Sequence, residues 1–118
     1  MLRSKSRRKT GPSEATQRLI WDRADYACER CDKHAPNHGG QIHHRNPRKM
    51  GGTVRPEANA ANNLVLLCAG CHADVESNRA QARKDGWLLQ DYQPPEVFPL
   101  TRIDGRQFLL VGEGRIWL

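Results

Sequence analysis

The chain has 118 residues, a net charge of +6 and an isoelectric point of about 9.6. With 37 % hydrophobic residues and a mean hydropathy of −0.78, it is expected to be one soluble domain with a modest core. No stretch approaches the roughly 18 apolar residues of a membrane-spanning helix. The basic start lacks the apolar run of a secretory signal, so a reducing, cytoplasmic compartment is expected.

Basic residues are concentrated in two blocks of the sequence. Residues 1–12 hold the first and predict a disordered basic arm. The second block contains Arg45, Arg48 and Lys49. Such blocks attract phosphate backbones without sequence preference. One interpretation is that the second block contacts phosphates. The alternative is that its side chains are solvated loop charges and that the protein has no polyanionic partner.

The first half of the chain predicts one helix and one short strand. Ser13 is a typical N-cap, and apolar residues at helical spacing extend the helix to about Tyr26. The turn residues 37–40 precede a strand at 41–44, and together they indicate a β-hairpin. Residues 46–62 form a long loop, and long loops in compact domains are often functional.

The second half predicts a strand, a helix and a small sheet. The apolar run 64–67 reads as a strand, and residues 69–84 read as one helix that ends before Gly86. Strands at 97–100, 106–111 and 115–118 form an antiparallel meander, with Asp104-Gly105 as the first hairpin turn. The fold class is therefore α+β, with an arm at 1–12, a core at 13–86 and a β extension at 87–118.

The four cysteines form two pairs of zinc-ligand spacing, Cys28-x-x-Cys31 and Cys68-x-x-Cys71. Two such pairs can surround a structural zinc ion tetrahedrally and join the two predicted helices. Two disulfides or a redox pair are the competing interpretations, and a reducing compartment favours the metal.

Histidines next to this zinc site suggest a second, catalytic metal. His43 and His44 end the predicted strand, and His72 begins the second helix. An ion held by His43 and His72 would keep open positions, as catalysis requires. His44 suits a general base near neutral pH. Neighbouring strand residues point to opposite faces, so both histidines reach one phosphate only if the strand end bends or the phosphate lies between them.

Two further residues, Asn63 and Glu76, each have more than one possible role. Asn63 can tie the loop that holds the histidine pair, as asparagine often does in loops. Glu76 lies one helical turn after His72 on the same face. It would complete the metal site, orient His72 from outside it, or remain a solvated helix carboxylate.

The order of these motifs resembles the HNH endonucleases of the ββα-metal type. The resemblance covers residues 17–86, and its matching string is Cys28-x-x-Cys31, Ile42-His43-His44-Arg45, Gly51-Gly52, Asn63-Leu-Val-Leu-Leu-Cys68-x-x-Cys71-His72. The segment after this string is similar to small HNH proteins of actinobacterial phages and their hosts.

The resemblance implies a role for each matching position. His43 and His72 correspond to ligands of the catalytic ion, His44 to the base that activates water, and Asn63 to the residue that fastens the loop. Some relatives have a further histidine where this chain has Glu76. The ion would be Mg²⁺ or Mn²⁺, with Ni²⁺, Co²⁺ and Zn²⁺ as alternatives. DNA is the expected substrate, and a phage terminase is an expected partner.

Two functions from different classes fit these motifs. The first is a metal-dependent endonuclease that hydrolyses DNA phosphodiester bonds with weak sequence preference. The second is a non-catalytic, zinc-stabilised DNA-binding module, which would need no base at His44. A zinc nucleobase deaminase is excluded because the sequence has no His-x-Glu motif paired with Pro-Cys-x-x-Cys.

Overall fold

The structure is a computed structural model that describes residues 11–47 and 56–118. Nearly all of the predicted basic arm, together with Arg48 and Lys49, lies outside the described residues. In chain order, the helices and strands are α1 (Glu14–Arg23), β1 (Gln41–His44), β2 (Leu64–Leu67), α2 (Ala69–Ser77), α3 (Arg79–Lys84), β3 (Leu100–Thr101), β4 (Gln107–Val111) and β5 (Gly114–Trp117).

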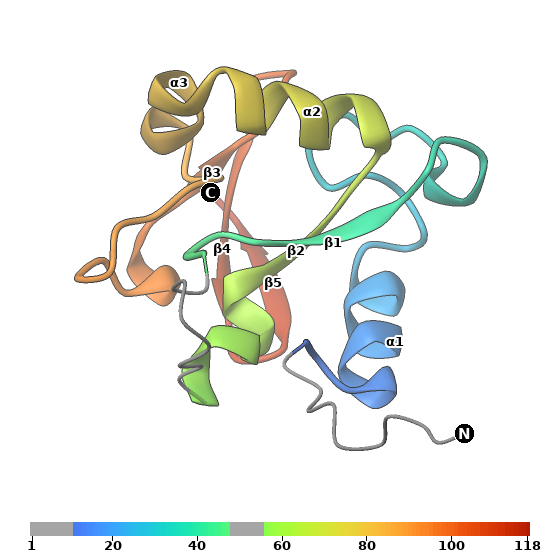
Figure 1. The fold of residues 1–118 in the computed structure, drawn as a ribbon, viewed down its shortest axis with the longest axis horizontal. Helices are drawn as coiled ribbons and strands as arrows, with labels where there is room; N and C mark the ends of the chain where they lie inside the picture. The colour runs from blue at the N-terminus through green and yellow to red at the C-terminus, as the bar shows by residue number, and fades with distance from the viewer. Residues whose placement is uncertain (1–10, 48–55) are drawn as a thin grey trace, which may run out of the picture.

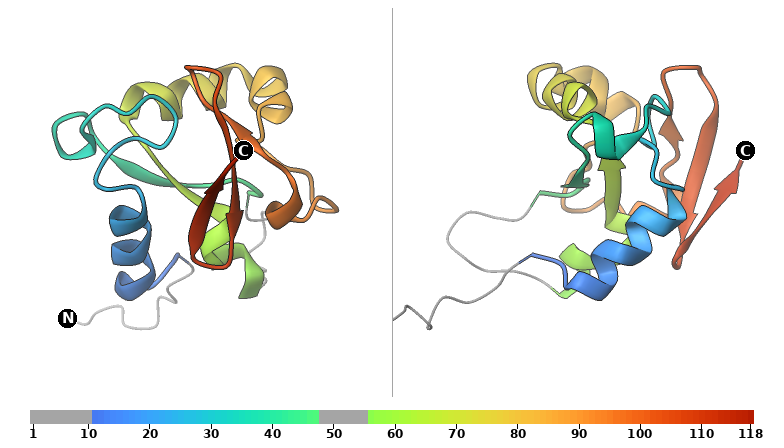
Figure 2. Two further views of the ribbon diagram at one scale, coloured as in Figure 1. Left: turned by 180° about the vertical axis from the view of Figure 1, so that it is seen from behind. Right: turned by 90° about the vertical axis from the view of Figure 1, so that its right-hand side faces the viewer.

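The centre of the fold is a two-stranded antiparallel sheet with a helix packed on it. β1 pairs with β2, and His43 lies opposite Val65 while His44 lies opposite Leu64. Helix α2 covers one face of the pair and α1 lies on the other side (Figure 1). The second, three-stranded sheet β3-β4-β5 covers the back of this unit (Figure 2). The predicted α+β fold with its C-terminal meander is confirmed.

Strand β2 is the only described strand that is buried along its whole length. Val65 and Leu67 face a cluster that contains the cysteines, α2 and the C-terminal sheet. Leu64 and Leu66 face a second cluster around Ile20 of α1. A strand buried on both faces reads as a continuous apolar run, which explains the sequence of this segment.

Helix α1 begins as predicted and ends earlier. The Ser13 hydroxyl accepts a hydrogen bond from the Thr16 N–H at 3.1 Å, so the N-cap is confirmed. The helix ends at Arg23 rather than near Tyr26. Asp25 and Tyr26 adopt positive φ angles of 55° and 60°, which no helix continues through. This turn directs the chain into the first cysteine pair.

Two further predictions were wrong in detail. The strand 41–44 is present, but its partner is β2 rather than a preceding strand, so the local β-hairpin is replaced by a pairing across residues 45–63. The helix predicted over 69–84 is two helices, because Asn78 leaves the helical region with φ −115° and ψ 62°. Gly86 does stop α3: its φ is +85°, and a Cβ there would meet the Pro99 carbonyl oxygen at 2.1 Å.

The C-terminal sheet packs directly on the centre of the fold. Phe108 and Leu110 of β4 lie in the same buried cluster as the cysteines and Trp87. The predicted Asp104-Gly105 turn joins β3 to β4, while the strand predicted over 97–100 is reduced to β3, because residue 97 ends a 3₁₀ turn. The division into an arm, a core and an extension stays a prediction.

Arg45 has a different role from the predicted phosphate contact. Its side chain is completely buried at the end of β1. The guanidinium donates four hydrogen bonds of 2.8–3.1 Å to the backbone carbonyls of residues 62, 86, 95 and 98. Burial lowers the pKa of Arg45 to about 9, so it remains charged at neutral pH. Arg45 is therefore an interior anchor, and that prediction was wrong.

Replacing Arg45 should destabilise the fold strongly. Arg45→Met keeps much of the side-chain length but takes the donor from four carbonyls in one buried and three partly buried hydrogen bonds, so we expect a loss of about 3–5 kcal/mol in the free energy of unfolding. Urea unfolding of the zinc-loaded protein measures it. Arg18→Met removes an exposed arginine on α1 and should cost less than about 0.5 kcal/mol. Equal losses for the two variants would contradict the anchoring role.

Candidate metal centres and active site

The four cysteine thiols meet in one cluster beneath the start of α2. All are unoxidised, and their sulfur atoms lie within 4.8 Å of one another. Cys31 Sγ and Cys68 Sγ are 3.7 Å apart. Zinc–sulfur bonds of about 2.3 Å in a regular tetrahedron give sulfur–sulfur edges of about 3.8 Å. The cluster therefore has the donors and dimensions of a structural zinc site, and it contains no disulfide.

The pKa shifts of the cysteines indicate that a cation would stabilise the cluster. A hydrogen bond from the Cys71 thiol lowers the pKa of Cys28 to about 4, and the same contact raises the pKa of Cys71. Cys28 therefore ionises readily to a thiolate. Its negative charge then disfavours ionisation of Cys71. Arg30, which also contacts Asp74, donates to Cys71 and offsets part of this charge. A divalent ion would let all four sulfurs ionise.

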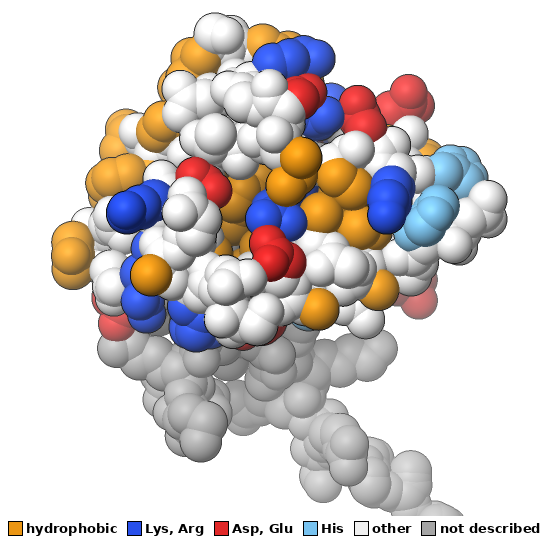
Figure 3. All heavy atoms as spheres, turned by 90° about the horizontal axis from the view of Figure 1, so that it is seen from above, with side chains coloured by type: hydrophobic (Ala, Val, Ile, Leu, Met, Phe, Trp, Pro, Cys, Tyr) orange, Lys and Arg blue, Asp and Glu red, His pale blue; other side chains and the backbone are white. Residues whose placement is uncertain are grey.

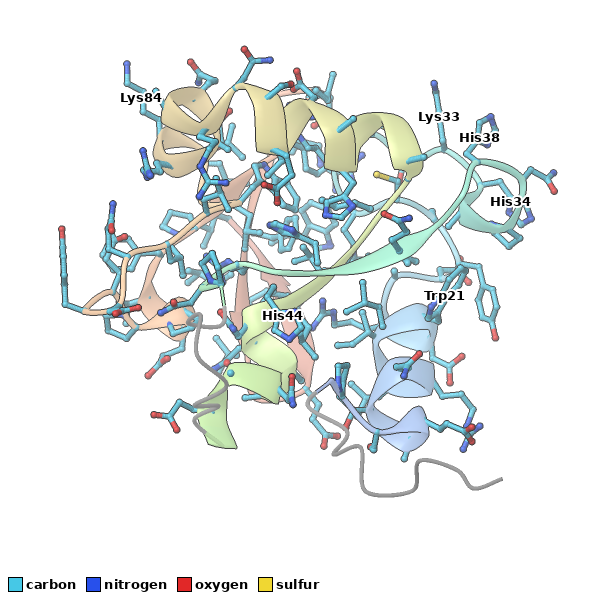
Figure 4. All side chains as sticks on the ribbon, in the orientation of Figure 1. Trp21, Lys33, His34, His38, His44 and Lys84 are labelled. Carbon is cyan, nitrogen blue, oxygen red and sulfur yellow. The ribbon has the colours of Figure 1, made fainter. Side chains whose placement is uncertain are left out.

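A second group of metal-ligand side chains lies between β1 and α2. It consists of His43, His72 and Glu76, whose ligand atoms are all within 4.8 Å of one another. His43 Nδ1 and His72 Nε2 are each 3.9 Å from Glu76 Oε2. The structure thus brings together the two histidines and the glutamate singled out in the sequence. His34 and His38 are exposed and lie far from this group (Figure 4).

Hydrogen bonds fix which nitrogen each imidazole offers. His43 Nε2 donates to the Trp87 carbonyl at 2.8 Å, which leaves Nδ1 without a proton when the ring is neutral. His72 Nδ1 donates to the Gln41 side-chain oxygen, which leaves Nε2 free. Both free nitrogens are the atoms that approach Glu76. Such outer partners set the tautomer of metal-binding histidines, so the group can hold a divalent ion.

His43 is also held in its neutral form. The side chain is 4 % exposed, and this burial lowers the pKa of His43 to about 4, against the raising effect of the Trp87 carbonyl. The ordinary value is about 6.5. At neutral pH the imidazole therefore needs no deprotonation before it binds a metal.

His44 does not join the group of three. It is partly exposed, and its ring points from β1 away from α2 (Figure 4). Its Nε2 donates to the Asn59 side-chain oxygen at 2.8 Å, which leaves Nδ1 as the basic nitrogen. The two neighbouring histidines thus occupy opposite faces of β1, as strand geometry requires. His44 ends β1, so its ring is at the strand terminus.

Asn63 is buried and fastens the segments on both sides of it. Its side-chain oxygen accepts from the Asn46 N–H at 2.9 Å. Its amide group donates to the carbonyls of Ala58 and Asn46, at 2.9 and 3.3 Å. These bonds fix the chain immediately after the histidine pair. That geometry agrees with the loop-fastening role expected from the sequence.

Three residues at the site were missed in the sequence. Gln41 lies two positions before His43 on the same face of β1, so strand periodicity could have indicated it. Arg79 Nη1 donates to Glu76 Oε1 at 2.9 Å, and its i,i+3 spacing was a usable signal. Asn59, the partner of His44, has no comparable signal because residues 56–63 fold as two short 3₁₀ turns.

Comparison with known protein families gives a match over the region that contains both clusters. A model of the HNH endonuclease family matches residues 28–78. These residues form an HNH endonuclease domain. The HNH domain holds all four cysteines, the histidine pair, Asn63 and the histidine–glutamate group. Searches of curated proteins and of solved structures found no match to the chain. Within the described residues, no helix is long and apolar enough to span a membrane.

Substitutions should separate the two clusters of the HNH domain. Cys68→Ala removes one of four sulfurs, so we expect it to lose zinc and at least about 3 kcal/mol of stability, or roughly 10 °C or more in melting temperature. His72→Ala alters the neighbour of Cys71 and should keep a full equivalent of zinc. Zinc content and thermal unfolding measure both. A zinc-replete Cys68→Ala protein of normal stability would contradict the zinc site.

Proposed function

We propose that the chain is a metal-dependent endonuclease that hydrolyses DNA phosphodiester bonds. The observation that carries this proposal is the convergence of His43 Nδ1, His72 Nε2 and the Glu76 carboxylate, with both imidazole tautomers fixed by outer hydrogen bonds. The match to the HNH endonuclease family supports it. The net charge of +6 favours a polyanionic substrate.

The three donors would leave part of the coordination sphere for substrate and water. A divalent ion held there would supply Lewis acidity at the scissile phosphoryl group and its leaving oxygen. Two imidazoles favour Mn²⁺, Ni²⁺, Co²⁺ or Zn²⁺. The Glu76 carboxylate adds a hard oxygen donor that Mg²⁺ and Mn²⁺ accept. We propose Mn²⁺ and Mg²⁺ as the ions to test first.

His44 would act as the general base. Its hydrogen bond to Asn59 orients the ring and assigns the basic lone pair to Nδ1, which would remove a proton from the attacking water. The Asn59 oxygen would then stabilise the imidazolium that forms. A phosphate bound at the end of β1 would have the His43 group on one side and His44 on the other. A role in phage DNA packaging with a terminase remains a prediction.

The second candidate is a non-catalytic DNA-binding module with the same scaffold. One observation favours it: the His44 ring points away from the three metal-ligand side chains. In such a module the cysteine cluster would keep its structural role, and the histidine–glutamate group would have no catalytic consequence. The two candidates therefore differ in turnover rather than in stability or DNA affinity.

Plasmid cleavage distinguishes the two candidates. With Mn²⁺ or Mg²⁺, the wild type should convert supercoiled DNA to nicked or linear product. His44→Ala should lower the rate by about 10²–10⁴-fold, the usual contribution of a general base, while keeping zinc and fold. His38→Ala, which alters an exposed histidine away from the site, should cleave normally. A wild type that binds plasmid but cuts it with none of the five proposed metals would establish the binding module instead.

Metal binding tests the three donors independently of turnover. The zinc-loaded protein should bind one further Mn²⁺, measured by the loss of the free Mn²⁺ signal in electron paramagnetic resonance. Glu76→Gln replaces a charged ligand by a neutral one and should weaken this binding at least about ten-fold. Glu113→Gln, at the exposed β4–β5 turn, makes the same charge change and should have no effect. Equal Mn²⁺ affinity in all three proteins would remove Glu76 from the site.

A further inference from the structure

A groove lies beside α3 and is lined by two of its arginines. It has a volume of about 610 Å³, and its lining includes Arg79, Arg83, Gln90, Asp91 and Tyr92. Its link to the metal-ligand side chains is the hydrogen bond from Arg79 to Glu76. Seen from above, Lys and Arg side chains gather over the α3 end of the molecule (Figure 3). The groove therefore adjoins the histidine–glutamate group through Arg79, although none of the three metal-ligand side chains lines it.

One wall of the groove is positively charged. Arg79 and Arg83 are exposed, and their i,i+4 spacing sets them on the same face of α3, about 6 Å apart along its axis. Arginine binds phosphate oxygens through a planar fork of donors. Two such groups on one face of α3, the first hydrogen-bonded to Glu76, suit successive phosphates of one nucleic-acid strand.

The groove is also lined by an aromatic ring. Tyr92 is 81 % exposed, the highest value among the large hydrophobic side chains described. Tyr92 also borders a second cavity of about 400 Å³, whose lining includes the carboxylates Glu57 and Glu96. Those carboxylates disfavour phosphate in the second cavity, whereas in the groove two arginines outnumber its one lining carboxylate, that of Asp91. A bound strand would therefore keep its phosphates over α3 and direct its bases toward Tyr92.

We propose that this groove binds unpaired nucleotides of the substrate, with phosphates on Arg79 and Arg83 and a base stacked on Tyr92. A base inside a duplex has both faces covered, so stacking on a protein ring requires an end, a flap or a single-stranded stretch. This inference rests on the proposed nuclease function and specifies its substrate. The enzyme would cleave beside single-stranded nucleotides in preference to within continuous duplex.

Binding is tested without turnover, using a fluorescent oligothymidine and a hairpin duplex of equal length, with no added catalytic metal. The wild type should bind the single strand more tightly. Tyr92→Ala should weaken single-strand binding roughly ten-fold and change duplex binding little, while Tyr92→Phe keeps the ring and the affinity. Ile103→Ala, which alters an exposed apolar residue outside the groove, is the matched control.

The basic wall is tested through the salt dependence of the same binding. Arg83→Gln should lower the slope of log Kd against log salt by about 1, the value expected for one lost phosphate contact. Lys84→Gln removes the same charge from the neighbouring side chain, which points away from the rest of the molecule (Figure 4), and should leave the slope unchanged. Equal slopes for the two variants, or equal single-strand affinity of wild type and Tyr92→Ala, would overturn the groove assignment.

Cleavage then separates this inference from the proposed function. On an oligonucleotide with a duplex and a single-stranded flap, the wild type should cut near the junction, and Tyr92→Ala should lose that preference. If Tyr92-dependent binding is seen but nothing is cut with any metal, the nuclease proposal fails and the nucleotide-binding groove stands. If duplex and flap are cut equally and Tyr92→Ala changes neither, the groove proposal fails and the nuclease stands.

Discussion

The arrangement of the site depends on one buried guanidinium. Arg45 reaches four backbone carbonyls from segments that have no strand partner at those positions, and buried carbonyls without donors are costly. One of the four belongs to Gly86, and the next carbonyl along the chain, that of Trp87, accepts from His43. The tautomer of the metal-facing imidazole is therefore set by a segment that Arg45 holds in place. A contact that stabilises the fold therefore also helps to orient the histidine two residues before it.

Helix α2 contributes to both metal-ligand clusters because its neighbouring residues point in different directions. Cys68 caps the helix, and Cys71 and Val75 face the buried cluster. His72 and Glu76, one position further on in each case, face β1 and the histidine of that strand. Successive helix positions differ by about 100°, so two clusters with different donors can share one helix. An ion in the cysteine cluster would fix the helix that carries two of the three donors of the other.

Structural features that depend on neighbouring residues are mostly predicted correctly from the sequence. Features that depend on contacts between residues distant in the sequence are mostly not. The Ser13 cap, the Gly86 stop, the cysteine spacing and the run of β2 all depend on residues within a few positions. Arg45 was misread because an arginine beside two histidines looks like a phosphate contact, and only carbonyls up to 53 residues away explain its burial. The partner of β1 was missed for the same reason.

The burial of Arg45 places a positive charge in the interior of the domain. Its charge lies at the end of β1, the same terminus as His44, in surroundings where fields are weakly screened. Its partners are neutral carbonyls, and no carboxylate among the described residues forms an ion pair with it. The charges of Arg23 and Glu29 act on the pKa of Arg45 in opposite directions, because a second arginine disfavours the charged guanidinium and a carboxylate favours it. The arginine that the sequence assigns to a phosphate contact thus holds four backbone positions together, so a phosphate contact would have to come from other basic residues.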